Sequence, residues 1–156
     1  MTSVYIETSV ISYLTARPSR DIVVAGHQQT TQEWWEKQSA KFELFVSELV
    51  IQEAIRGDPR AVQERLKILE SIEALAVTPK ALQLAQFFLE QSALPAKAEA
   101  DALHISISVT NGVDYLLTWN CKHIANAITR KKIEMLCYQQ NYEPSVICTP
   151  EELMEV

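Results

Sequence analysis

The sequence has very little glycine and proline. It contains three glycines and six prolines among 156 residues, so long flexible linkers are not expected, and it has no glycine-rich phosphate loop. No apolar run approaches the roughly 18 residues of a membrane span, and Met1 is not followed by the basic and apolar segments of a signal peptide. A chain of this length suits one hydrophobic core. These features predict a single cytoplasmic domain over residues 1–156, without a membrane anchor.

Metal-binding and redox cysteine motifs are also missing. The three cysteines cannot all pair, and their spacing fits neither a zinc knuckle nor a CxxC motif. We therefore expect reduced thiols in a reducing compartment. The three histidines show no HExxH spacing, which argues against a zinc hydrolase. We interpret one of them, His104, as a satisfied core residue because its helix is largely apolar.

Basic residues are in the minority. The net charge of −6 argues against a broad electropositive surface that binds nucleic acid without specificity. It leaves room for a local nucleic-acid site. Clustered carboxylates that hold cations would also make the formal charge more negative than that of the working protein.

Short β-branched segments alternate with helix-forming segments along the chain. The predicted strands cover residues 3–6, 41–46, 74–77, 113–118 and 146–148. The predicted helices cover residues 8–14, 22–40, 47–55, 60–72, 80–91, 95–110 and 122–136, and a terminal helix starts at Thr149-Pro150. This alternation predicts a three-layer α/β fold with a central parallel sheet of about five strands. Ligands of such sheets lie beyond the carboxyl ends of the strands, where the strand order reverses.

Three acidic residues stand where this rule places a site. Glu7 directly follows the first strand; a solvated loop acid is the alternative. Glu53 lies beside the apolar stripe of its helix, where an unpaired carboxylate is costly, and a buried salt bridge would also explain it. Asp101 lies in the first turns of its helix, where an acid is favourable for the helix dipole alone.

Thr118 and Asn120 end the fourth strand and can reach the same crevice. Three carboxylates packed together without a cation would repel one another. Hard oxygen ligands suit Mg²⁺ or Mn²⁺, whereas zinc prefers imidazole and thiolate. We therefore predict a divalent-metal site.

Four short segments together resemble the PIN domain family, most closely the toxin nucleases of VapC type from type II toxin–antitoxin systems. They are residues 4–9 (VYIETS), 47–54 (SELVIQEA), 100–105 (ADALHI) and 116–120 (LLTWN). Each segment is weak alone, but the four occur in the expected order on the expected elements. The resemblance covers nearly the whole chain.

The resemblance implies a Rossmann-like PIN fold and cleavage of single-stranded RNA by metal-activated water. Carried over by position, Glu7, Glu53 and Asp101 would hold Mg²⁺ or Mn²⁺ and Asn120 would complete the catalytic set. Thr8 and Thr118 would support the site. The family also implies a homodimer and a cognate antitoxin that inserts into the active groove.

Two positions depart from the family pattern. The first acid is commonly Asp, and Glu7 is one methylene longer. The fourth is also commonly Asp, so the neutral Asn120 should weaken a second cation more than the first.

Basic residues near the predicted crevice are candidates for RNA contact. Arg17 and Arg20 follow the first-strand region, and Lys122 follows Asn120. The leading hypothesis is thus a toxin endoribonuclease. A catalytically weak or inactive PIN-like module that binds RNA or protein is the alternative that Asn120 favours, and a DNA-directed nuclease ranks last because the short chain shows no DNA-binding appendage.

Overall fold

A computed structural model of the chain describes residues 1–155. Within them, five parallel strands form one sheet in the order β3-β2-β1-β4-β5. The strands are β1 (Ser3–Ile6), β2 (Glu43–Ser47), β3 (Glu73–Leu75), β4 (Tyr115–Leu117) and β5 (Val146–Cys148). The helices are α1 (Thr8–Thr15), α2 (Ile22–Lys37), α3 (Glu48–Ala54), α4 (Pro59–Leu69), α5 (Pro79–Glu90), α6 (Glu99–Thr110) and α7 (Ala127–Gln139), with a 3-10 turn, η1 (Ser39–Lys41).

The first strand lies in the middle of the sheet. All four residues of β1 are buried, as its apolar, β-branched composition predicts for a strand covered on both faces. Tyr5 is paired with Phe45 on one side and with Leu116 on the other. Because β2 and β3 extend from one side of β1 and β4 and β5 from the other, the strand order reverses at β1, and the crevice expected of such sheets lies beyond its carboxyl end.

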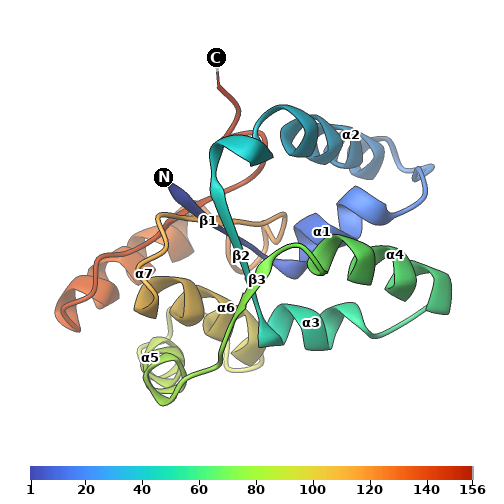
Figure 1. Cartoon of the computed structure of the whole chain (residues 1–156). Coiled ribbons are helices and arrows are strands. Elements are labelled where there is room, and N and C mark those ends of the chain that lie inside the picture. The colour runs from blue at the N-terminus through green and yellow to red at the C-terminus, as the bar shows by residue number, and fades with distance from the viewer. Residues whose placement is uncertain (156) are drawn as a thin grey trace.

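Helices cover both faces of the sheet. In Figure 1, α1, α2 and α4 lie to one side of the central strands, and α5, α6 and α7 lie to the other. The C-terminal half of α6 is buried, with every residue from His104 to Val109 inaccessible to solvent or nearly so. The predicted three-layer α/β fold with a five-stranded parallel sheet is confirmed.

The predicted terminal helix is wrong. Residues 150–154 form a turn, although Thr149 and Glu152 make the reciprocal contacts of a capping box, from Thr149 N to Glu152 Oε1 (3.0 Å) and from Glu152 N to Thr149 Oγ1 (3.3 Å). The carbonyl of Leu153 accepts a hydrogen bond from the Trp34 indole (3.3 Å). That tertiary contact engages a backbone group that a continuing helix would use.

The helix predicted from residue 122 begins five residues later. The Asn120 carbonyl accepts hydrogen bonds from both Ile124 N (3.0 Å) and Ala125 N (2.8 Å), which folds the intervening residues into a turn. Asn126 then caps α7 by accepting from Ile128 N. Other boundaries shift by a few residues; α6, for example, starts at Glu99 instead of residue 95.

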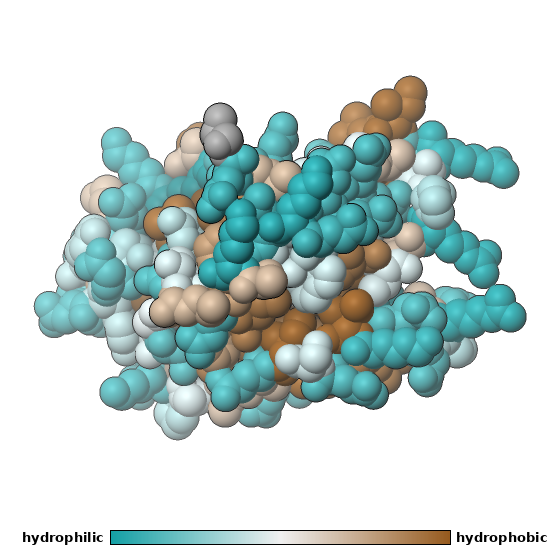
Figure 2. Space-filling model, turned by 45° about the horizontal axis from the view of Figure 1, so that its top comes forward, coloured by the Kyte–Doolittle hydropathy of each residue, from teal (hydrophilic) through white to brown (hydrophobic). Residues whose placement is uncertain are grey.

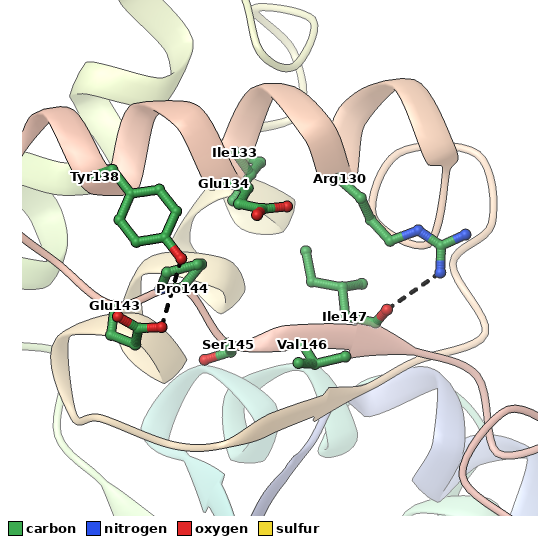
Figure 3. Close-up of a pocket in the computed structure, with 9 residues that line it drawn as sticks. All are labelled: Arg130, Ile133, Glu134, Tyr138, Glu143, Pro144, Ser145, Val146 and Ile147. Atoms are coloured by element: carbon green, nitrogen blue, oxygen red, sulfur yellow. Dashed lines mark hydrogen bonds between the residues drawn. The ribbon is translucent and has the colours of Figure 1, made fainter.

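The open edge of β5 is partly closed by α7 (Figure 3). Arg130 Nη1 donates to the Ile147 carbonyl over 3.2 Å, which occupies an edge acceptor that another strand would otherwise bind. A hollow of about 250 Å³ lies beside this contact. Across it, Tyr138 donates to Glu143 (3.5 Å), so these polar side chains have partners of their own.

Hydrophilic residues cover most of the face in Figure 2, and hydrophobic residues show in the hollow between them and in a group that protrudes at the upper right. Within residues 1–155, no helix combines the length and apolarity needed to cross a membrane.

Candidate metal centre

Glu7 connects β1 to α1. Its backbone N–H donates to the Leu117 carbonyl (3.0 Å), extending the pairing of β1 with β4 by one residue. The side chain is only 6% exposed. Its Oε1 accepts from Ser9 Oγ (2.5 Å) and Thr118 Oγ1 (2.6 Å), and its Oε2 accepts from Ser9 N (3.2 Å). The side chain thus acts as the N-cap of α1, a role that smaller polar residues usually fill.

Glu53 reaches the same region from α3. That helix starts at the carboxyl end of β2, where Ser47 Oγ accepts from Val50 N (3.2 Å) as the predicted N-cap. Glu53 Oε1 accepts from Thr8 Oγ1 (2.5 Å) and lies 2.7 Å from His104 Nε2. Burial acts to raise the pKa of Glu53, but the interactions with His104, the hydrogen bond from Thr8 and the positive charge of Arg56 together outweigh it and hold the pKa below the usual value. Glu53 is therefore an ionised, half-buried carboxylate at neutral pH.

Two carboxylates and an imidazole converge here. Ligand atoms of Glu7, Glu53 and His104 all lie within 4.8 Å of one another. In each carboxylate, Oε1 has two hydrogen-bond partners, which fill its two lone pairs. Among residues 1–155, no donor contacts Glu53 Oε2. The unused oxygen capacity of this pair therefore resides in the Oε2 atoms.

In the part of the chain that the structure describes, the charge of this pair is not neutralised by a direct ion pair with lysine or arginine. Within residues 1–155, neither Glu7 nor Glu53 forms an ion pair with a lysine or arginine. The donors that contact them are neutral hydroxyls, a backbone N–H and an imidazole. Adjacent carboxylates without compensation are unfavourable. A divalent cation fits this donor set, and the oxygen-rich composition suits Mg²⁺ or Mn²⁺.

Asp101 lies in a neighbouring cluster. It is the third residue of α6. Its Oδ1 accepts from Asn120 Nδ2 (3.0 Å), and its Oδ2 lies 2.9 Å from His123 Nδ1. Asn120 is joined in turn to the first group, because its backbone N–H donates to Thr118 Oγ1 (2.9 Å). The structure thus brings Glu7 and Glu53 together directly and connects Asp101 to them through two polar residues.

The supporting threonines contact different acids. Thr8 donates to Glu53 and Thr118 to Glu7. The three basic candidates are all exposed and lie on loops and turns. Arg17 lines a hollow of about 1010 Å³ between the C-terminal end of α1 and the start of α4. Because Thr8 opens α1, Arg17 and the acids lie at opposite ends of that helix.

Two histidines contribute contacts that the sequence did not predict. His104 is 1% exposed, as expected of a core residue, yet it also contacts Glu53. His123 pairs with Asp101 and had no predicted role. A signal for His104 was present, because a histidine in a largely apolar helix segment that is buried must find polar partners. The identity of those partners depends on how α6 packs against α3.

No protein-family model matches the sequence, and no curated protein sequence matches it. Solved structures do match. Mycobacterium tuberculosis VapC20, described as a Sarcin-Ricin loop cleaving toxin, superposes with a TM-score of 0.57 at 18% identity, covering 72% of this chain and 86% of its own. A chain of Rickettsia felis VapBC2 bound to a DNA fragment from their promoter gives 0.61 at 16% identity, covering 95% and 98%. The chain therefore has the PIN-like α/β fold of the VapC toxin structures.

Proposed function

We propose that this chain is a metal-dependent endoribonuclease that cuts single-stranded RNA and serves as the toxin of a toxin–antitoxin pair. The observation that carries the proposal is the pair of adjacent carboxylates, Glu7 and Glu53, which stands at the carboxyl end of the central strand without a direct lysine or arginine ion pair among the described residues. It lies in a fold shared with a toxin described as cleaving the Sarcin-Ricin loop. A fold of this kind hosts its chemistry at that edge of the sheet.

Each side chain has a role in this proposal. Glu7 and Glu53 would hold Mg²⁺ or Mn²⁺ through their Oε2 atoms, with Asp101 completing the metal-holding set. When bound, the cation would polarise a phosphate oxygen and lower the pKa of the attacking water. Thr8 and Thr118 fix the two glutamates by their hydroxyl hydrogen bonds. Asn120 donates to Asp101, where an aspartate would place two carboxylates in contact.

The proposed function also implies binding partners. The Rickettsia felis relative was solved as VapBC2 with promoter DNA, which supports a cognate antitoxin for this chain. A homodimer is proposed from the family resemblance. The exposed cations Arg17, Arg20 and Lys122 would contact RNA phosphates, with Arg17 engaging the RNA strand at the far end of α1 from the acids, and would offset part of the net charge of −6.

A second candidate function is a PIN-like module that binds RNA or protein without cutting. Both Asp101 oxygens already have protein partners, and Asn120 adds no charge to the site. A cation would then have to compete with Asn120 and His123 for Asp101. This arrangement favours weak or substrate-dependent catalysis.

A cleavage assay tests the proposal. Purified protein is incubated with single-stranded RNA and single-stranded DNA in Mn²⁺, in Mg²⁺ and in chelator. We expect RNA cleavage that requires the metal and falls more than tenfold in Glu7→Gln and Asp101→Asn. RNA binding with no cleavage in any metal would support the binding module instead.

A matched control variant separates loss of the site from a general effect of removing an acid. Glu70 is exposed and lies at the C-terminal end of α4, so Glu70→Gln should cut like the wild type. Equal residual cleavage in all variants would identify a contaminating nuclease and overturn the proposal.

Arg17→Ala should weaken RNA binding and reduce its salt dependence. For one lost phosphate contact, the slope of log binding constant against log salt concentration should fall in magnitude by about 0.7.

A further inference from the structure

A chain of hydrogen bonds runs through the buried interior to Glu53. Ser47 Oγ lies 2.7 Å from Tyr5 Oη, Tyr5 Oη lies 2.7 Å from His104 Nδ1, and His104 Nε2 lies 2.7 Å from Glu53 Oε1. Three of these side chains are at most 1% exposed. The chain joins β1, the end of β2, α6 and α3. It closes on itself, because Ser47 also caps the helix that carries Glu53.

The direction of these bonds follows from the contact between His104 and Glu53. At 2.7 Å, an imidazole nitrogen lone pair facing a carboxylate oxygen would be repulsive unless a proton lay between them. Without a cation at that position, His104 Nε2 must therefore carry a hydrogen and donate it to Glu53. A second hydrogen on Nδ1 would force the Tyr5 hydroxyl to donate to Ser47 and would leave the Ser47 proton without an acceptor in this chain, so Nδ1 is the acceptor.

The remaining protons then have one consistent arrangement. The Tyr5 hydroxyl carries its single proton at neutral pH and donates it to Nδ1 over 2.7 Å. Ser47 donates to the Tyr5 oxygen and accepts from Val50 N. Every buried donor and acceptor along the chain is satisfied, whereas the opposite direction would leave the Ser47 proton without an acceptor in this chain.

We propose that Tyr5 fixes His104 in the Nε2–H tautomer and that His104 is a positioning residue for Glu53, not a metal ligand. The hydrogen bonds from His104 and Thr8 both occupy Glu53 Oε1, which leaves Glu53 Oε2 as the atom available to a cation. The cation then meets oxygen ligands only, although an imidazole lies within 4.8 Å. The part of this inference that concerns a bound metal rests on the proposed function. The tautomer of His104 does not depend on that function.

The consequence is a preference for hard cations. A site with two carboxylates and one imidazole ligand would favour Zn²⁺ over Mg²⁺ and Mn²⁺, whereas an all-oxygen site would lose the advantage that nitrogen gives to zinc. Outer partners of metal ligands typically change metal affinity by about 10–100-fold when they are removed. Removal of His104 should therefore weaken Mn²⁺ binding without changing which class of metal is preferred.

Nitrogen NMR and metal titration test the inference. We expect the ¹⁵N spectrum of His104 to show a protonated Nε2 and an unprotonated Nδ1, in chelator and after addition of Mg²⁺. His104→Gln retains an N–H near the Nε2 position and should bind Mn²⁺ within about threefold of the wild type. His104→Leu should weaken Mn²⁺ binding at least tenfold, and Tyr5→Phe should give a smaller loss with a mixture of His104 tautomers.

A matched control separates positioning from lost stability. Ser108 lies on the same helix and makes a buried 2.8 Å hydrogen bond to Ser145. Ser108→Ala should lower the melting temperature yet leave Mn²⁺ affinity unchanged. An unprotonated Nε2 in the metal-free protein, loss of the Nε2 proton on metal binding, or equal losses in His104→Gln and His104→Leu would each overturn the inference.

Failure of the proposed function gives a different pattern. A protein that bound no Mn²⁺ and cut no RNA would contradict the nuclease proposal. The metal-free ¹⁵N spectra of the wild type and of Tyr5→Phe would still decide between the two hydrogen-bond directions. A protonated Nε2 that becomes mixed in Tyr5→Phe would support the positioning chain even then.

Discussion

At the scale of single residues, the ionisation of Glu53 depends on the groups that contact its carboxylate. A carboxylate partly removed from water would hold its proton more tightly if burial acted alone. Its contacts with His104 and Thr8, together with the positive charge of Arg56, reverse that tendency and lower the pKa of Glu53. The folded protein therefore favours the ionised form that a cation requires.

The same shift predicts an acid-dependent loss of stability. Because the folded pKa lies below the unfolded one, the unfolded state binds more protons between the two, and stability rises with pH there. The contribution is complete above the unfolded pKa of about 4.3 and disappears as pH falls through the folded pKa. Urea unfolding in chelator at pH 7, 5, 4 and 3 should show the difference between wild type and Glu53→Gln shrinking with acid. The exposed control Glu70→Gln should show no such trend, and a difference that grows on acidification would contradict the prediction.

Thr118 offers a second prediction at this scale. Its buried hydroxyl donates to Glu7 Oε1 and accepts from Asn120 N. Thr118→Val keeps the shape but removes both contacts, and we expect a loss of about 1–3 kcal/mol in the free energy of unfolding. Thr118→Ser keeps the hydroxyl and should lose only about 0.8 kcal/mol for the missing methyl group. Chemical denaturation of the three proteins measures this order; a valine variant as stable as wild type would show that the hydroxyl has no such role.

Residue contacts also mark the limit of prediction from sequence. Local patterns in the sequence predict the positions of Glu7 and Glu53 at the sheet edge. Glu7 directly follows β1, and Glu53 lies beside the apolar stripe of its helix. The contacts of His104 with Glu53 and of His123 with Asp101 join residues 51 and 22 positions apart. Such pairs depend on packing distances between elements, and no spacing in the sequence encodes those distances.

At the scale of elements, α3 is short and needs support at both ends. Ser47 caps its start, and Arg65 of α4 holds its end by donating to the carbonyls of Ala54 (2.8 Å) and Arg56 (2.6 Å). These bonds satisfy helix-end acceptors that would otherwise lack partners. Arg65 thereby fixes the helix that carries Glu53, although it lies outside the acid cluster.

Arg65→Lys should therefore destabilise the protein, although the substitution keeps the positive charge. An ammonium group cannot reproduce the two-pronged donor geometry of a guanidinium, and we expect a cost of about 1–2 kcal/mol in unfolding free energy. Lys67 on the same helix forms only an exposed pair with Glu64, so Lys67→Gln should cost less than about 0.5 kcal/mol. Denaturant unfolding compares them. Equal effects of the two substitutions would show that the Arg65 contacts contribute no more than a surface ion pair.

Element order was predictable from sequence, but several boundaries were not. Ser47, Thr78 and the alternation of apolar segments indicate helix starts and strands by local rules, and all five strands occur where they were expected to within a few residues. The start of α7 departed because a local turn uses the backbone groups before it, and the terminal turn departed because a tertiary partner engages its backbone. Asn120 organises the turn before α7, and Trp34 engages the carbonyl of Leu153.

At the scale of the whole molecule, the proposed metal site would couple cation binding to folding. The acids proposed to hold the cation follow β1 and lie on α3, beside the end of β4, so they come together only when the sheet is assembled. A ligand that binds only the folded state adds about 2.7 kcal/mol at one hundred times its dissociation constant. For a domain of this size, each kcal/mol raises the melting temperature by about 2–4 °C.

Mn²⁺ at that concentration should thus raise the melting temperature by about 5–10 °C, and an excess of chelator should reverse the rise. Glu7→Gln should abolish most of the shift, because it removes the charge of one of the two facing carboxylates. Twenty Asp and Glu side chains make nonspecific Mn²⁺ binding at the surface a real competitor, and Glu70→Gln controls for it. A shift that persists in Glu7→Gln but falls in Glu70→Gln would assign the stabilisation to surface acids. An unchanged melting temperature in the wild type would argue that the Glu7–Glu53 pair tolerates its repulsion without a cation.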